Sequence, residues 1–222
     1  CLRRVVRVFL GGVWPMILTV EDAILERLRR GLGRSVKTVE PYGGQFDEAG
    51  LSHVMGGVPA LYVHFAGHKN PKPKNTAGDV LQVPATFVIY VVVRNVSSES
   101  AGRRGTAREV GAYQLIEAVR HLLGNQDFGL AIDAFKVGSV QLLGNVKVGN
   151  SGLTAYGCSF DTHWVERLAT AQGLPRRGDP VFEGLGGERS DDEPDFLRVG
   201  LMHDVEANGS VDVVDVVQLR SI

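Results

Sequence analysis

Histidine and acidic residues are the side chains with which this chain could bind a metal or move protons. The sequence holds six histidines, of which His64 and His68 are four residues apart. They lie where a predicted strand ends, so this spacing places them on no common helical face, and we expect satisfied or exposed imidazoles instead of metal ligands. The acidic run at residues 191–195 could hold a cation, but a charge run in a linker is usually solvated.

Catalytic patterns are also missing from the sequence. The glycine pairs at residues 43–44 and 56–57 open no strand-to-helix phosphate loop, and there is no Gly-x-Ser-x-Gly elbow. Cys1 and Cys158 are far apart, and Cys158 alternates with apolar residues, which favours reduced thiols over a disulfide. No nucleophile, base and orienting group can be assembled, so we predict a protein that is not an enzyme and needs no cofactor or metal.

Basic loops are the remaining candidates for function. Residues 68–78 form a loop stiffened by two prolines and carrying Lys69, Lys72 and Lys74. A second basic turn contains Arg103 and Arg104. Such loops cannot bury their backbones and should project into solvent, where their charge could contact an acidic partner. A solvated hairpin tip is the alternative, because exposed lysines are common on protein surfaces.

The element that must position these loops is the long apolar stretch at residues 79–96. Every second residue from Leu81 to Val93 is apolar, which is the period of a strand with one face on a core. The other face starts polar and becomes apolar at Val88, so we expect one end of the strand to be covered on both faces. Pro84 cannot donate to a ladder, which suggests that its half lies at an edge or projects beyond the core.

The remaining elements follow from periodicity, caps and turn residues. An amphipathic helix is predicted from Thr19 to a stop at Gly31 or Gly33, with Ile17, Val20, Ile24, Leu28 and Leu32 on its apolar face. A second helix is predicted at residues 107–123, and strands are predicted at residues 36–40, 59–67, 135–143 and 153–165. This order favours an α+β two-layer sandwich with two main helices on one side of a mainly antiparallel sheet.

Composition suggests four segments in the chain. We expect an N-terminal extension at residues 1–15, with a natural start near Met16, and an α+β domain at residues 16–168. A Gly-, Pro- and charge-rich linker at residues 169–195 then leads to a C-terminal β-hairpin arm at residues 196–222, whose Asn208–Gly209 pair is a strong turn signal. The 24 basic and 25 acidic residues nearly cancel, so no global field draws the chain to nucleic acid or a membrane.

Four stretches carry a resemblance to a known family. They are AILERLRRGL at residues 23–32, VPALYVHFAG at 58–67, GAYQLIEAVRHLLG at 111–124 and GLTAYGCSFDTHWV at 152–165. Their order and spacing resemble the Mu-like bacteriophage tail terminator family, a Mu-like phage tail protein family formerly of unknown function. The resemblance covers roughly residues 16–165, and the long C-terminal extension departs from it.

The resemblance implies a function as well as a fold. It implies a structural tail terminator that caps the head-proximal end of a phage tail as a hexameric ring, stops tube and sheath polymerisation, and joins the tail to the neck. Its partners would be other copies of the chain, the tail tube protein, the sheath protein if the tail contracts, and a neck or head-tail connector protein, with DNA only in the tail channel and no membrane. The location would be the virion tail after assembly in the host cytoplasm.

Two other functions stay open at this point. A neck adaptor or tail completion protein of the same virion could share the fold, because folds are shared more widely than functions. A cation-dependent hydrolase using the acidic linker and scattered histidines is the alternative from another class. The basic residues Lys69, Lys72, Lys74, Arg103 and Arg104 are the predicted partner contacts, and residues 196–219 are predicted to pack on their own domain or on a neighbouring subunit.

Overall fold

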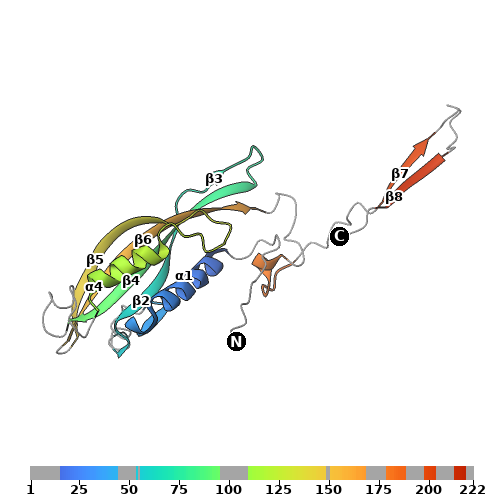
Figure 1. Cartoon of the computed structure of the whole chain (residues 1–222). Helices are drawn as coiled ribbons and strands as arrows, with labels where there is room; N and C mark the ends of the chain where they lie inside the picture. Colours follow the sequence, from blue (N-terminus) through green and yellow to red (C-terminus); the bar gives the residue numbers. More distant parts are fainter. Residues whose placement is uncertain are drawn as a thin grey trace. The chain divides into compact units, whose positions relative to one another are not determined.

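The computed structural model divides the chain into two compact units, Cys1–Leu168 and Ala169–Ile222 (Figure 1). It describes residues 16–44, 54, 56–95, 110–148, 151–168, 179–188, 198–203 and 213–218. In the first unit two helices, α1 (Met16–Leu32) and α4 (Ala112–Leu123), pack on a six-stranded sheet. The predicted α+β class is confirmed.

The sheet is mixed but mostly antiparallel. Its order is β1-β2-β4-β6-β5, formed by β1 (Thr38–Pro41), β2 (Ala60–His68), β4 (Val80–Asn95), β6 (Ser151–Arg167) and β5 (Lys136–Val148), and the short β3 (Lys72–Pro73) also pairs with β4. Only β1 and β2 run parallel to each other among these described pairs. Strand β1 was predicted to start at residue 36, but it begins two residues later, at Thr38.

The central strand β4 has the predicted alternation. Val83, Ala85, Phe87, Ile89 and Val91 are all buried in the main core beneath the helices. These positions share one face because successive strand side chains point to opposite sides. Pro84 pairs with His163 of β6, and on its other side it lies between the end of β2, opposite Ala85, and β3, opposite Gln82. Val83 and Ala85 beside it are buried in the main core, so the predicted projection beyond the core is wrong.

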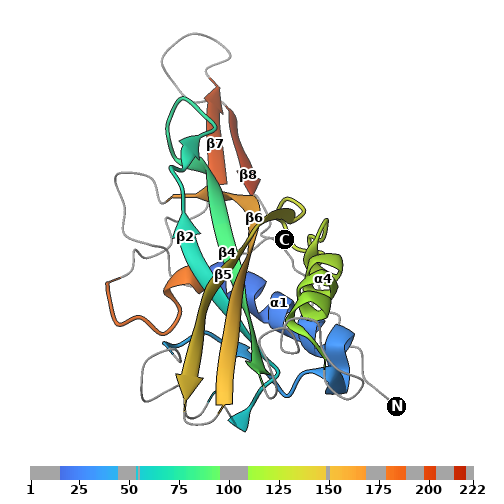
Figure 2. The ribbon, with the colours of Figure 1, turned by 90° about the vertical axis from the view of Figure 1, so that its left-hand side faces the viewer.

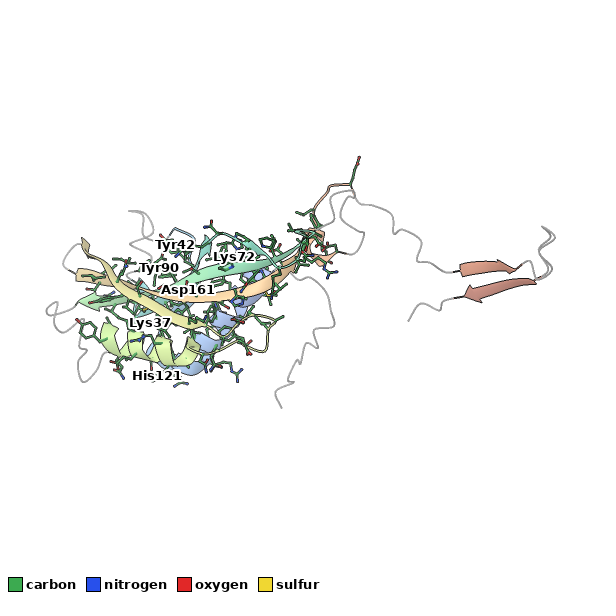
Figure 3. All side chains as sticks on the ribbon, turned by 90° about the horizontal axis from the view of Figure 1, so that it is seen from above. Lys37, Tyr42, Lys72, Tyr90, His121 and Asp161 are labelled. Atoms are coloured by element: carbon green, nitrogen blue, oxygen red, sulfur yellow. The ribbon has the colours of Figure 1, made fainter. Side chains whose placement is uncertain are left out.

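The opposite face of the sheet carries a smaller apolar cluster near the end of β4. It contains Val54, Val58, Ala60, Tyr62, Val92 and Leu153, with Tyr42, Tyr90 and Ala155 packed against it. One end of β4 is therefore covered on both faces, as the sequence predicts. Figure 3 shows Tyr42 and Tyr90 on the side of the sheet away from α1 and α4, and His121 on the helical side.

Helix α1 begins earlier than predicted and ends at the second of its two predicted glycine stops. It begins at Met16, not Thr19, because Met16 packs against the main core and extends the apolar contact by a turn. The sequence prediction placed Ile17 on the apolar face, but this residue is 36% exposed. Leu25, which the prediction did not include, is buried. The helix passes through Gly31 and ends at Leu32, and Gly33 follows with a φ of +51°, a conformation that glycine adopts without strain.

Gly31 stays inside the helix because of the neighbouring helix. A Cβ at this position would lie 2.4 Å from Cδ2 of Leu122, so the missing side chain lets α4 approach α1 closely. Helix α4 itself starts at Ala112 with Gly111 as an extended N-cap, so the predicted start at residue 107 is wrong. Residues 107–109 lie outside the described residues.

The buried stripe of α4 matches its prediction. Ala112, Leu115, Ile116, Val119 and Leu123 are buried in the main core, and Leu122 packs against it. Tyr156, Cys158, Phe160 and Trp164 of β6 supply the facing side of that core. Figure 2 shows both helices on the same side of the long strands, with α4 to their right. The two layers are thus held by one apolar core between them.

The second unit holds a hairpin and a short turn. Strands β7 (Arg198–His203) and β8 (Val213–Gln218) pair in antiparallel fashion, as predicted, with Arg198 opposite Gln218. A 3-10 turn, η2 (Pro180–Phe182), lies earlier in this unit. The predicted turn pair Asn208–Gly209 and the acidic residues 191–195 lie outside the described residues.

Candidate partner-binding surfaces

The lysine-bearing loop is an ordered turn built on the start of β4. Lys72 and Pro73 form β3, opposite Gln82 and Leu81, and the backbone N–H of Lys74 donates to the carbonyl of Val80 at 2.7 Å. Inside the turn, Oδ1 of Asn75 accepts from the backbone N–H groups of Gly78 at 3.1 Å and Val80 at 3.2 Å. The side-chain amide of Asn75 also donates to Asp79. We call residues 68–78 the lysine turn.

The lysine turn presents its charges to solvent. Lys69, Lys72 and Lys74 are all exposed, and residues 68–77 are exposed throughout. The backbone N–H of Lys69 donates to the carbonyl of Pro84 at 3.2 Å, which attaches the first side of the turn to β4. The three charges are therefore held on a hydrogen-bonded frame, so a partner would order few additional backbone residues on binding.

The two predicted arginines follow β4 in the sequence, but Arg103 and Arg104 lie outside the described residues. The described strand is roughly 50 Å long at about 3.3 Å per residue, so the lysine turn at its start lies far from Asn95 at its end. Of the five predicted contact residues, the structure therefore describes the three lysines, which together form one candidate surface.

A hollow at the arginine end of β4 was not predicted from the sequence. It has a volume of about 370 Å³ and is lined by Arg34, Ser35, Lys37, Val58, Pro59, Val93, Arg94 and Val110. Arg34 and Lys37 are exposed, whereas Val58 and Val93 are 4% and 2% exposed. The described lining thus has a basic rim and an apolar floor, and we call it the basic pocket.

The residues of the basic pocket come from four separate parts of the chain. They follow the end of α1, precede β2, end β4 and precede α4. The backbone N–H of Lys37 donates to the carbonyl of Pro59 at 2.9 Å and so joins two of these segments. No local motif marks such a site, and its one sequence signal is Arg94, which follows the apolar residues Val88 to Val92 on one face of β4.

The histidines singled out in the sequence lie on different faces of β2. His64 packs against the rings of Tyr42 and Tyr90, with centroids 5.3 and 5.8 Å away. The register shifts between Phe65 and Gly67, so His68 instead lies beside Phe65 and Trp164. Within the described residues, no group of three or more His, Cys, Asp or Glu side chains could hold a metal ion.

One polar pair at β6 resembles part of a catalytic site. Nδ1 of His163 lies 3.1 Å from Oδ2 of Asp133, which resembles a base and its orienting carboxylate. The nearby hydroxyls have other partners: Thr86 donates to Asp161 at 2.6 Å, and Ser159 donates to the carbonyl of Ser139 at 3.1 Å. Figure 3 shows Asp161 on the face away from the helices. Among the described contacts, no hydroxyl or thiol completes a nucleophile and base pair with His163.

Cys158 is poorly suited to act as a nucleophile. It is a free thiol in the main core and 1% exposed. Burial raises its pKa from 9.0 to about 11, and the positive charge of Arg120 only partly opposes this. Since the thiolate is the reactive form, Cys158 is unreactive at neutral pH. Cys1 lies outside the described residues.

An exposed apolar strip borders α4 along the edge strand β5. Val137, Val140 and Leu142 pair across to the buried Phe160, Cys158 and Tyr156, so they lie on the helical side of the sheet. Each is 38–51% exposed, and Tyr113 of α4, 45% exposed, lies with its ring 6.1 Å from that of Tyr156. Among the described helices, none combines the length and apolar character that crossing a membrane requires.

A two-layer α+β body whose central strand carries a basic turn at one end defines the structural class of this chain. Its residues 16–165 match the family model described as Bacteriophage Mu, Gp37, and the chain belongs to that family. It is also similar to the Mu-like prophage FluMu protein gp37 of Haemophilus influenzae (strain Rd). The two are 26% identical over 155 residues, covering 70% of this chain and 72% of that protein. This chain is therefore a phage-related protein.

Proposed function

We propose that this chain is a structural tail terminator, which caps the head-proximal end of a phage tail as a hexameric ring. Membership of the Bacteriophage Mu, Gp37 family supports a phage role. The described polar groups supply surface contacts and hydrogen bonds between strands, which suits a structural protein more than a catalyst. In this role the chain stops polymerisation of the tube, and of the sheath in a contractile tail, and joins the tail to a neck or connector protein.

The main structural support for a contact with the tail is the lysine turn. Its three exposed lysines project from a turn fixed to β4 by backbone hydrogen bonds. A preorganised positive turn recognises an acidic surface through charge complementarity, which raises the association rate and selects the partner. We assign this contact to the end of the tail tube. Arg103 and Arg104 belong to a second contact, with the neck, a neighbouring copy or DNA in the channel.

Two features support assembly into a ring. The apolar strip at Val137, Val140, Leu142 and Tyr113 is a surface that burial against another copy would stabilise. The hairpin of β7 and β8 is two-stranded, and such a hairpin is marginally stable alone in water. A neighbouring copy would supply the surface it needs, and this arm would tie adjacent copies together.

The test is charge reversal in the lysine turn. Lys69→Glu, Lys72→Glu and Lys74→Glu together change the charge by six units at one surface, and we expect at least tenfold weaker co-sedimentation with purified tail tubes. The matched control is Arg30→Glu, Lys136→Glu and Arg167→Glu, which makes the same total change at exposed positions outside the turn. Equal tube binding by both triple variants and the unaltered chain would refute the tube contact.

A second measurement on tail tubes, the length that they reach, distinguishes a terminator from a neck adaptor. A terminator sediments with tube ends and shortens tubes when added during polymerisation. A neck adaptor or tail completion protein binds the connector and leaves tube length unchanged. Tube length measured by electron microscopy, with and without the chain, therefore decides between the two structural functions.

A further inference from the structure

We propose that the basic pocket is a docking site for an acidic peptide with an aromatic anchor, supplied by residues 191–196 of a second copy of this chain. The inference rests on the proposed ring, because it requires neighbouring copies. It assigns the pocket a ligand class and adds a contact distinct from both the lysine turn and the apolar strip.

The pocket has the size and charge of a peptide site. Its volume of about 370 Å³ falls within the range of small ligand sites, and three of its described lining residues, Arg34, Lys37 and Arg94, are cations. No carboxylate is among those described lining residues. Guanidinium groups bind carboxylates with two parallel hydrogen bonds, so this rim selects for negatively charged side chains.

The floor of the pocket distinguishes a peptide from a free anion. Val58 and Val93 are buried there, and Pro59 and Val110 are half-buried beside them. A phosphate or a nucleic-acid backbone would gain nothing from these apolar groups. A peptide with an apolar side chain next to its acids uses both the rim and the floor. The chemistry therefore favours an acidic segment that also carries an apolar anchor.

The region after the first unit contains a short segment with this composition. Residues 191–196 read Asp-Asp-Glu-Pro-Asp-Phe, with four carboxylates followed directly by Phe196. Proline at position 194 limits the conformations that the free segment must lose on binding. The segment lies outside the described residues and belongs to the second compact unit. Its charge and its aromatic residue match the rim and the floor of the pocket.

A peptide titration tests the docking directly. The receptor is the full chain with its own segment neutralised by Asp191→Asn, Asp192→Asn, Glu193→Gln and Asp195→Asn. The probe is a fluorescent peptide with the sequence of residues 187–197, followed by anisotropy. We expect saturable binding that weakens at least tenfold in receptor that also carries Arg34→Glu and Lys37→Glu, and also with a Phe196→Ala peptide.

The controls make the result specific to the pocket. A receptor with Lys72→Glu and Lys74→Glu carries the same charge change at the other end of β4 and should bind the peptide as before. Circular dichroism of each receptor checks the fold. No saturable binding, or equal loss in the two double variants, would overturn the proposal.

Cross-linking tests whether the segment comes from a second copy. A carbodiimide joins Lys37 to nearby carboxylates, and an equal mixture of ¹⁵N-labelled and unlabelled full chain reports their origin by mass. Mixed-isotope cross-links between Lys37 and residues 191–195 support the proposal, whereas links only within one chain overturn it.

These outcomes are separable from those of the proposed function. A chain that caps tubes but neither binds the peptide nor forms the mixed link remains a terminator without this contact. A chain that binds the peptide and forms the link but ignores tubes retains the docking site and loses the terminator role.

Discussion

The thiol of Cys158 gives a prediction whose size follows from its burial. The pKa of this thiol is raised from 9.0 to about 11 because the side chain is buried in the main core. The folded state therefore holds the proton more tightly than the unfolded state. Its contribution to stability is fully present below pH 9 and is lost as the pH rises through 11. Each pKa unit is worth about 1.4 kcal/mol, so the total loss is on the order of 2–3 kcal/mol.

Replacing the thiol should remove this pH dependence. Cys158→Ala keeps a small side chain at a position that is 1% exposed and carries no ionisable group. The alanine variant starts from a lower free energy of unfolding because a small cavity is left. Between pH 8 and 11 the free energy of unfolding should then fall by about 2–3 kcal/mol more in the unaltered chain than in the variant.

Urea unfolding at several pH values measures this difference. Tryptophan fluorescence can follow the transition because Trp164 is buried in the same core. The two proteins differ only at residue 158, so the effects of pH on all other groups cancel in the comparison. A difference that stays constant from pH 8 to 11 would refute the reasoning, because it would mean that the thiolate finds solvent or a positive charge in the folded state.

Two further predictions concern the core and the arm. Phe87 is fully buried beside Phe65 and Phe135, so Phe87→Ala should lower the free energy of unfolding by about 3–5 kcal/mol. As a control in the same urea titration, Val165→Ala, at a half-exposed position of β6, should change it by less than about 1 kcal/mol. Removing residues 170–222 should convert the expected six-fold ring into smaller species by light scattering, and a ring that persists would show that the arm is not required.

The sequence predicts those parts of the fold that depend on local periodicity. The strand β4 and the buried stripe of α4 were found because alternating or helical apolar spacing reflects which face is buried. The C-terminal ends of the helices, at Leu32 and Leu123, were also found, whereas their starts were missed because packing determines them. Met16 joins α1 through the core, and Gly31 continues it because Leu122 fills the space where its side chain would lie.

Candidate surfaces that depend on tertiary packing are even harder to predict from the sequence than the starts of the helices. The lysine turn was visible in sequence because its lysines and prolines are contiguous. The basic pocket was not, because Arg34, Val58, Arg94 and Val110 come together only when four chain segments meet. Of the predicted contact residues, Arg103 and Arg104 lie outside the described residues. Lys69, Lys72 and Lys74 lie on the lysine turn at one end of β4, whereas the basic pocket lies at the other end of this strand.

That separation constrains how the protein can assemble. The lysine turn pairs with β4 at Leu81 and Gln82, and the basic pocket includes Val93 and Arg94 of the same strand, so roughly 40 Å of continuous strand lies between them. β4 pairs along this length with β6, which makes it a rigid spacer. A small partner therefore engages one site or the other. In the proposed ring, two sites held at opposite ends of one strand would let each copy contact the tail with one end of β4 and a neighbouring copy with the other.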